Sequence, residues 1–258
     1  MIDNQIRPFE AINANGSSAL LIACDHADNL IPDEMAGLGL HPDYLRQHIA
    51  YDIGAKQVAM RLAEFFDAPL LLANYSRLVV DLNRHLHDPS LIAEYSDGVE
   101  IPGNLNLTDE MRARRINHYF HPYHNQYQDM VNNLIAKHNR PIILAVHSFT
   151  PIMNGLVRPW EMGVLWNQDE VLARQLIGSL SKVTGFNIGD NQPYHATDPH
   201  GYAQAIHSHE RGVELALLEI RQDLIADSDG QIKITDLVCQ AVAPILNSTH
   251  QCVREDPD

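Results

Sequence analysis

Histidines directly follow short apolar runs at two places in this chain, an arrangement that suits metal binding. Residues 19–24 lead to His26, and residues 141–146 lead to His147 and Ser148. Both runs have the length and composition of buried strands. Because ligands of open α/β sheets gather outside the carboxyl ends of the strands, the two histidines are candidates for one site. For a single histidine such as His147, a structural hydrogen bond to a neighbouring loop is an equally good interpretation.

Arginines, an asparagine and a glutamate lie at two further strand ends. Asn83 and Arg84 follow the apolar run 78–82, and Glu219 and Arg221 close the run 213–220. The guanidinium group of arginine matches the geometry of a carboxylate, so these arginines could bind a substrate carboxylate. Structural ion pairs with nearby aspartates would also explain why arginines stand there. Two imidazoles and one oxygen ligand can hold zinc with an open position, and a glutamate outside that set can take a proton from water. Together these residue types favour metal-assisted hydrolysis of a small acidic amide.

The expected elements alternate between strands and helices. The strands are expected at residues 19–24, 69–73, 78–82, 141–148, 161–166, 186–189 and 213–220. The helices are expected at residues 41–66, 108–138, 169–182, 195–211 and 236–246. This alternation favours an α/β fold with a mostly parallel or mixed sheet and helices on both faces. Without an internal repeat or a linker, we expect a single domain over residues 1–258, with a core from about 19 to 248, a polar arm over 1–18 and a long loop over 87–106.

Composition and charge exclude several classes of partner. The net charge of −15 disfavours nucleic acid and anionic membranes, which require a basic surface. Three widely spaced cysteines give neither a disulfide framework nor metal-type spacing. No charged leader with an apolar stretch opens the chain, and no apolar run approaches the length of a membrane span. We therefore expect a soluble, cytoplasmic protein.

Several segments match a known family in order from about residue 20 to residue 225. The longest is Ser76-Arg77-Leu78-Val79-Val80-Asp81-Leu82-Asn83-Arg84. The others are Cys24-Asp25-His26-Ala27 with Ile31-Pro32, Tyr51-Asp52-Ile53-Gly54-Ala55, His147-Ser148, Gly189-Asp190-Asn191 with Pro193-Tyr194, and Leu218-Glu219-Ile220-Arg221. Through these segments the chain resembles the N-formylglutamate amidohydrolase family, whose fold is similar to that of the zinc-dependent carboxypeptidases.

The resemblance implies a role for each candidate residue on a zinc-exopeptidase-like (phosphorylase/hydrolase-like) fold. His26 and His147 resemble the first and the late zinc ligand, and Glu219 resembles the general base. Ser148 then becomes a supporting hydroxyl. The residues that we expect to bind the substrate are Arg77, Asn83, Arg84 and Arg221.

The third ligand is where this chain departs from the carboxypeptidase pattern. Those enzymes carry a ligand glutamate three residues after the first histidine, and Asn29 stands at that position here. Asp52, which lies beside the apolar face of the helix expected at 41–66, is the preferred replacement, although an ion pair with Lys56 would also account for it. Asn29 and Asp28 remain alternatives.

The expected function is hydrolysis of the amide bond of an N-formyl or other N-acyl amino acid such as N-formylglutamate, a reaction of histidine degradation. The expected cofactor is zinc or another divalent metal, and the expected partner is the small acidic substrate. The chain lacks the longer His-Ser-Gly start of other formylglutamate hydrolases, which leaves the acyl group open. The alternatives are a metallocarboxypeptidase, an N-acyl amino acid deacylase, or a non-catalytic carboxylate-binding protein on the same fold.

Overall fold

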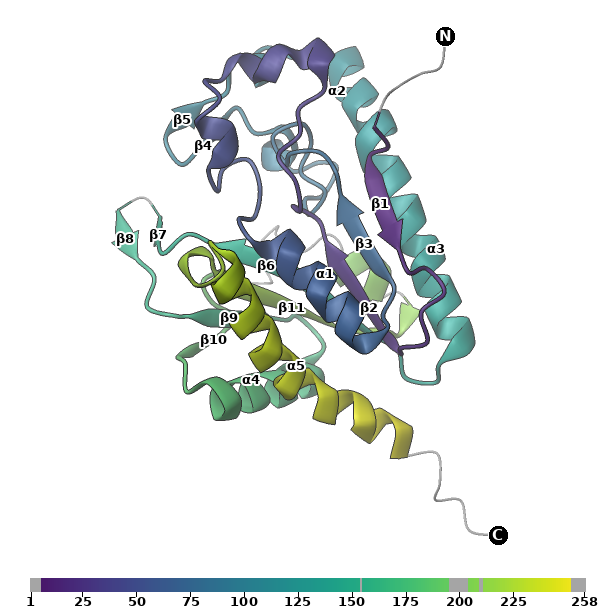
Figure 1. Ribbon diagram of the computed structural model, residues 1–258. Coiled ribbons are helices and arrows are strands. Elements are labelled where there is room, and N and C mark those ends of the chain that lie inside the picture. The colour runs from purple at the N-terminus through teal and green to yellow at the C-terminus, as the bar shows by residue number, and fades with distance from the viewer. Residues whose placement is uncertain (1–5, 154, 195–203, 209–210, 252–258) are drawn as a thin grey trace.

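A seven-stranded sheet forms the centre of the molecule (Figure 1). The computed structural model describes residues 6–153, 155–194, 204–208 and 211–251. In spatial order the strands are β1 (Phe9–Ile12), β3 (Leu70–Ala73), β2 (Leu20–Cys24), β6 (Ile142–Phe149), β11 (Glu214–Arg221), β9 (Met162–Leu165) and β10 (Ile188–Asp190). The central strands β3, β2, β6 and β11 are parallel, whereas β1 pairs antiparallel with β3 and β9 pairs antiparallel with β11. The predicted α/β fold with a mostly parallel sheet is therefore confirmed.

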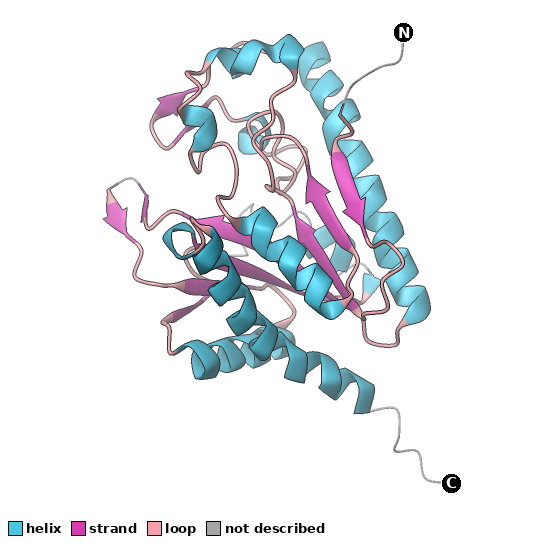
Figure 2. Cartoon of the chain, viewed as in Figure 1, coloured by secondary structure: helices cyan, strands magenta, loops and turns pink. Residues whose placement is uncertain are grey.

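Helices cover both faces of this sheet, as Figure 2 shows. On one face lie α1 (Ala55–Phe66), α4 (Glu170–Thr184) and α5 (Ser228–Gln251). On the other lies α3 (His121–Lys137), which continues α2 (Asp109–Arg115) through the π-helical turn Ile116–Phe120. Two small hairpins, β4 (Tyr95–Ser96) with β5 (Val99–Glu100) and β7 (Ile152–Met153) with β8 (Leu156–Val157), project from one side. No helix in the described part of the chain is both long and apolar enough to cross a membrane.

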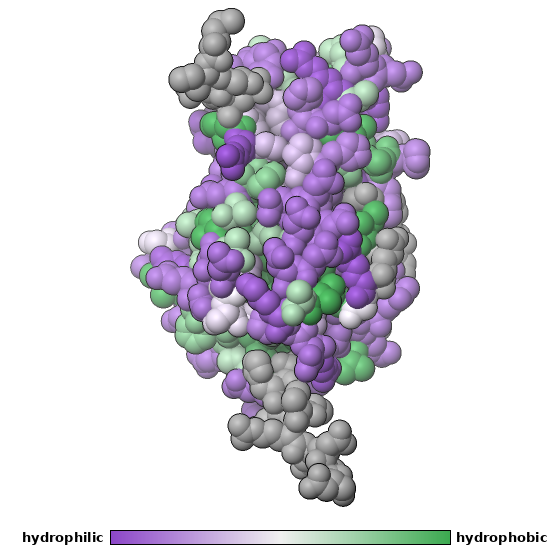
Figure 3. All heavy atoms as spheres, turned by 90° about the vertical axis from the view of Figure 1, so that its right-hand side faces the viewer, coloured by the Kyte–Doolittle hydropathy of each residue, from purple (hydrophilic) through white to green (hydrophobic). Residues whose placement is uncertain are grey.

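The central strands are apolar because both of their faces are covered. In β2, Leu20, Ile22 and Cys24 pack toward α1 and α5, whereas Leu21 and Ala23 pack toward α3. All eight residues of β6 are buried as well. Strands buried on both faces are continuous apolar runs, which is why β2 and β6 are evident in the sequence. The outer side of α3 is mostly hydrophilic with scattered apolar residues (Figure 3).

The prediction of a polar arm over residues 1–18 missed one strand. β1 forms an edge of the sheet, with Phe9 opposite Ala73 and Ile12 opposite Leu70. Its four residues are half-buried or exposed, so the strand lacks the apolar signal of its neighbours. An edge strand pairs with only one neighbour and is partly open to solvent, so its side chains need not be apolar. Such a strand is therefore hard to recognise from the sequence.

The helix expected at residues 41–66 begins only at Ala55. The preceding Gly54 has a φ of 79°, and a Cβ there would lie 2.2 Å from the carbonyl oxygen of Ile225. Because Gly54 has a left-handed backbone conformation and lies against another backbone segment, the helix cannot extend toward the N-terminus beyond Ala55. Asp52 consequently lies in a turn, and its backbone N–H donates to the carbonyl oxygen of His26 at 2.9 Å.

The apolar run 78–82 is buried, but it is a loop and not the expected strand. Side chains replace the neighbouring strand as hydrogen-bond partners: Asn104 Nδ2 donates to Leu78 O at 3.0 Å, and Arg115 Nη1 donates to Val79 O at 3.1 Å. Buried carbonyl groups need partners, and polar side chains satisfy them as well as a sheet does. This loop delivers Asp81 to the carboxyl end of β2. Of the helix expected at 195–211, only Gln204–Ser208 and Arg211 fall within the described residues.

The same loop is held by a buried pair of neutral histidines. His124 Nε2 donates to Leu82 O at 2.9 Å, so His124 Nδ1 is left to accept from His207 Nε2, also at 2.9 Å. Burial lowers the pKa of His124 to about 4 and that of His207 to about 3, the latter helped by the neighbouring His124. In the unfolded chain both residues bind protons near pH 6.5.

We expect this pair to make the protein less stable as the pH falls from about 7.5 to 5.5. Between the unfolded and folded pKa values the unfolded chain binds more protons, so the free energy of unfolding falls by roughly 1 kcal/mol for each histidine. Urea titrations of the wild type and of His207→Gln give the free energy of unfolding at both pH values. Groups that titrate in both proteins change both free energies alike, so the difference between the proteins measures the contribution of the histidine. An identical pH dependence in the two proteins would contradict it.

Candidate active site

A cavity of about 260 Å³ opens at the carboxyl ends of β2, β6 and β11. Its lining includes His26 and Asp52 from the segments around β2 and α1, His147 from β6 and Glu219 from β11. Residues of both hairpins, among them Tyr95 and Met153, line its outer part. The site therefore lies where an α/β sheet is expected to bind a ligand.

His26, Asp52 and His147 form a buried cluster whose ligand atoms lie within 4.8 Å of one another. Asp52 Oδ2 is 2.8 Å from His147 Nδ1 and 3.4 Å from His26 Nδ1. Ser148 supports this arrangement, since its Oγ donates to Ile53 O at 2.9 Å and its backbone N–H lies 3.3 Å from Asp52 Oδ2. The structure thus brings together the three residues that the sequence selected as metal ligands.

The outer nitrogen of His26 is held by Asp81, a residue to which the sequence analysis assigned no role at the metal site. His26 Nε2 donates to Asp81 Oδ1 at 2.7 Å, which leaves the lone pair of Nδ1 facing Asp52. Arg77 donates two hydrogen bonds to Asp81 Oδ2, at 2.7 and 3.1 Å. Carboxylates that hold the second nitrogen of a histidine ligand are typical of metal sites.

The charge on Asp52 also suits metal binding. Burial acts to raise the pKa of this carboxyl group, but His26 and His147 outweigh burial and hold the pKa well below its usual value. The residue is therefore an anion at neutral pH. His26 Nδ1 is buried and has no hydrogen-bond partner among the described residues. Two imidazoles, a carboxylate and an unpaired nitrogen are the donor set that a divalent metal ion would use, so the residues present fit a metal.

Glu219 lies beside this cluster on the neighbouring strand. It stands opposite His147 in the parallel register of β6 and β11, and its Oε2 is buried without a hydrogen-bond partner in the described structure. Burial raises the pKa of Glu219 to about 7, an effect that His147 partly offsets and Asp52 reinforces. A carboxylate with such a pKa can both take and return a proton near neutral pH.

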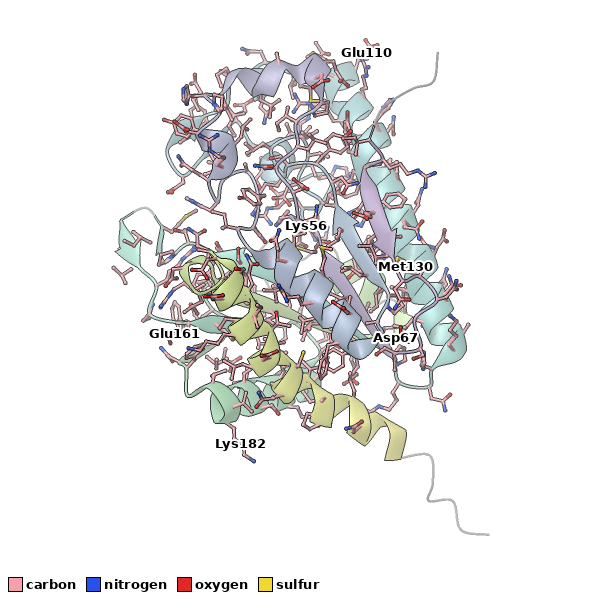
Figure 4. The ribbon with its side chains drawn as sticks, viewed as in Figure 1. Lys56, Asp67, Glu110, Met130, Glu161 and Lys182 are labelled. Carbon is pink, nitrogen blue, oxygen red and sulfur yellow. The ribbon has the colours of Figure 1, made fainter. Side chains whose placement is uncertain are left out.

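The four residues expected to bind the substrate lie in different surroundings. Arg77, Asn83 and Arg84 line the cavity, although Arg77 is already bonded to Asp81. Arg84 donates to Ser90 Oγ and to the backbone of Asn83, and it forms no ion pair with any described residue. The structure does not bring Arg221 to the cavity: its guanidinium binds Asp223 and lies 3.3 Å from Glu161, which Figure 4 labels at the edge of the molecule.

The two alternative third ligands lie outside the cluster. Asn29 Nδ2 donates to Leu45 O at 2.7 Å, and Asp28 binds Lys56 Nζ at 2.8 Å. Lys56 stands at the start of α1 (Figure 4), so it neutralises Asp28 and not Asp52. Neither Asn29 nor Asp28 contributes a ligand atom to the described cluster.

Sequence reasoning missed Arg158, which contacts two residues of the cavity lining. Its guanidinium lies over the ring of Tyr194, 4.6 Å from the centroid, and Nη1 donates to Tyr194 Oη at 3.1 Å. Phe149, whose ring centroid is 5.8 Å from the same guanidinium, and Tyr194 both line the cavity. Arg158 follows the β7–β8 hairpin, which lies outside the strands expected from the sequence, so only the match at Pro193-Tyr194 pointed to this region.

Comparison with known proteins agrees with the fold and the reaction class. The sequence matches the N-formylglutamate amidohydrolase family over residues 18–226. A gene product of Agrobacterium tumefaciens of known crystal structure is 30% identical, with a TM-score of 0.89 over 97% of each chain. N-formylglutamate amidohydrolase from Ralstonia eutropha JMP134 is 19% identical, with a TM-score of 0.66 over 95% of this chain and 99% of that one. The search of curated proteins gave no match.

The α/β sheet, with a His-Asp-His cluster and a buried glutamate at its carboxyl edge, defines an enzyme of the amidohydrolase class. Because the family match spans most of the sequence, the chain belongs to the N-formylglutamate amidohydrolase family.

Proposed function

We propose that this protein is a zinc-dependent hydrolase of small N-acyl amino acids, with N-formylglutamate as the first substrate to test. The observation that carries the proposal is the buried cluster of His26, Asp52 and His147 with Glu219 on the adjoining strand. Family membership supports the reaction class. Zinc in such a site polarises a carbonyl group and lowers the pKa of water, and other divalent metals can provide the same chemistry.

The chain's own residues transfer the protons and orient the substrate. Glu219 Oε2, which is free of other partners among the described residues, takes a proton from the attacking water. It then gives that proton to the amide nitrogen that leaves, so the free amino acid departs as an amine and the acyl group as a carboxylate. The raised pKa of Glu219 suits both steps, since the proton is held neither too weakly nor too tightly.

The arginines at the cavity support a substrate with two carboxylates. The chain contains 33 acidic and only 18 basic residues, so an arginine without an acidic partner is notable. Arg84 lines the cavity, Arg158 contacts the lining residue Tyr194, and neither forms an ion pair among the described residues. A guanidinium binds a carboxylate through paired hydrogen bonds. We assign the α-carboxylate to Arg84 with Asn83 and the side-chain carboxylate to Arg158.

The proposal is tested by metal analysis together with a panel of substrates. Protein purified without added metal is analysed for bound zinc, and hydrolysis is measured on the N-formyl, N-acetyl and N-succinyl derivatives of glutamate, aspartate and norvaline. We expect bound zinc and the highest kcat/KM for an N-formyl dicarboxylic amino acid. A chain that binds no metal and releases no amino acid from any member would overturn the proposal.

Replacing Arg84 by glutamine is expected to raise KM for the best substrate by roughly 10- to 100-fold, because one charge-assisted hydrogen-bond pair is lost. The effect on kcat should be smaller, since the carboxylate is bound in the ground state and in the transition state alike. Arg221→Gln provides the comparison: its contacts lie outside the cavity, so its KM should stay within about twofold of wild type. Equal KM values in the two variants would remove Arg84 from substrate binding.

A further inference from the structure

We propose that Tyr123 and Asp25 form a positioning relay behind the metal cluster, in which Tyr123 orients Asp25 and Asp25 orients His147. The inference rests on the proposed metal-dependent function, and it assigns roles to two residues outside the ligand set and the base. Both are positioning residues, because they act only through His147.

The relay runs from α3 to the end of β2 and on to β6. Tyr123 Oη donates to Asp25 Oδ1 at 2.5 Å. The other carboxylate oxygen, Asp25 Oδ2, lies 3.6 Å from His147 Nε2. Asp25 is 1% exposed, His147 3% and Tyr123 0%, and of these three residues only His147 lines the cavity. Residues far apart in the sequence therefore form one buried polar line.

The two atoms that face each other in this line have no other partner. Asp25 Oδ2 and His147 Nε2 are both buried, and neither makes a hydrogen bond to any described residue. At 3.6 Å they stand just beyond hydrogen-bond distance, and a small tilt of the imidazole ring closes the gap. An unpaired buried polar atom is costly, so this tilt would let each atom satisfy the other.

The contact fixes which nitrogen of His147 can bind a metal. Both carboxylates accept, Asp25 from Nε2 and Asp52 from Nδ1, so without a metal both nitrogens of His147 carry a proton. A metal ion would replace the proton on Nδ1, while Asp25 keeps the proton on Nε2. Nδ1 is the nitrogen that faces Asp52, at 2.8 Å. Asp81 does the same for His26, with Nε2 bound at 2.7 Å and Nδ1 facing the cluster. Each histidine ligand thus has its own carboxylate on the outer nitrogen, an arrangement that commonly raises metal affinity.

Tyr123 explains how Asp25 keeps the orientation that this role requires. With Oδ1 bound to the phenol, the carboxylate plane is fixed and Oδ2 is directed at His147. The anchor comes from α3, whose buried side packs against the sheet. The relay therefore links α3, on one face of the sheet, to the proposed metal ligand His147 at the carboxyl end of β6.

Two tyrosines on the same buried side of α3 give a matched pair of variants. Tyr123→Phe and Tyr127→Phe each remove one buried hydroxyl group from neighbouring turns of the helix. Tyr127 Oη has no hydrogen-bond partner among the described residues, so its loss leaves Asp25 untouched. We expect Tyr123→Phe to weaken zinc binding about fivefold, as loss of one orienting hydrogen bond predicts, and Tyr127→Phe to leave it unchanged.

Substitution of Asp25 itself gives the larger effect and a rescue. Asp25→Ala removes the acceptor and is expected to weaken zinc binding by about 10- to 100-fold. Asp25→Asn keeps an oxygen that can accept from His147 Nε2, so it should recover part of the loss. Zinc affinity is measured by chelator competition, the cobalt-loaded proteins are compared by their visible spectra, and thermal unfolding without metal shows whether each variant folds.

The outcomes separate the relay from the proposed function. If wild type binds zinc but Tyr123→Phe and Tyr127→Phe bind it equally well, with unchanged cobalt spectra, the relay is wrong and the function stands. If the variants differ as expected but wild type hydrolyses no substrate, the function is wrong and the relay stands. A folded wild-type chain that binds neither zinc nor cobalt overturns both.

Discussion

Replacing Glu219 by glutamine is expected to lower kcat by about 10²- to 10⁴-fold while bound zinc stays at the wild-type level. The amide cannot take a proton from water, yet it has nearly the same shape as the carboxyl group. Glu219 lies beside the cluster but contributes no ligand atom to it, so metal content should not depend on its charge. Steady-state kinetics on the best substrate, with metal analysis of the same samples, measures both quantities.

Glu214→Gln is the matched control for this experiment. Glu214 opens the same strand β11, but its carboxylate binds Arg140 at 3.2 Å near the surface, far along the strand from the cavity. This variant should retain full activity. A fully active Glu219→Gln protein would remove Glu219 from the mechanism, and loss of zinc from it would make the glutamate a ligand.

Asp52→Asn is expected to lose bound metal, with zinc affinity falling by about 10²-fold or more, because a ligand matters at least as much as the groups that orient it. The change replaces an anionic ligand by a neutral one at the position that contacts His147 Nδ1. Activity measured without added metal should fall with the metal content. Chelator competition and metal analysis after gel filtration test this directly.

Asn29→Ala distinguishes Asp52 from the alternative third ligand. Asn29 was an alternative third ligand in the sequence, but its side chain binds Leu45 O. We expect this variant to keep its zinc, with at most a modest loss of stability. The opposite result, zinc lost from Asn29→Ala and kept in Asp52→Asn, would exchange the roles of the two residues.

The sequence predicted the site best where the backbone is regular. His26 and His147 follow strands that are buried on both faces, and such strands are evident from composition alone. Parallel strands end at one edge of the sheet, so their side chains had to meet there. Asp52 was selected for a different reason, because a carboxylate beside an apolar face needs a partner.

The contacts that irregular segments create were much harder to predict. The apolar run before Asn83 has the composition of a strand, and nothing local reveals that Asn104 and Arg115 satisfy its carbonyl groups. Asp81 therefore appeared as a strand residue and not as the partner of His26. Arg221 follows Glu219 by two residues, yet its guanidinium binds Glu161 and Asp223 away from the cavity. These outcomes depend on long-range contacts that a pattern along the chain does not contain.

The position of β11 has a consequence for how the enzyme matures during synthesis. This strand is the last of the sheet to be made, yet it inserts between β6 and β9, which are made earlier. A growing chain thus contains His26, Asp52 and His147 before Glu219 exists. Pairing of strands that lie far apart in the sequence costs entropy and is slow. The part of the sheet that ends at β6 and the part that contains β9 and β10 therefore join only after β11 has been made. If His26, Asp52 and His147 hold the metal and Glu219 is the base as proposed, a nascent chain contains its metal ligands early but gains its base only with the final strand of the sheet.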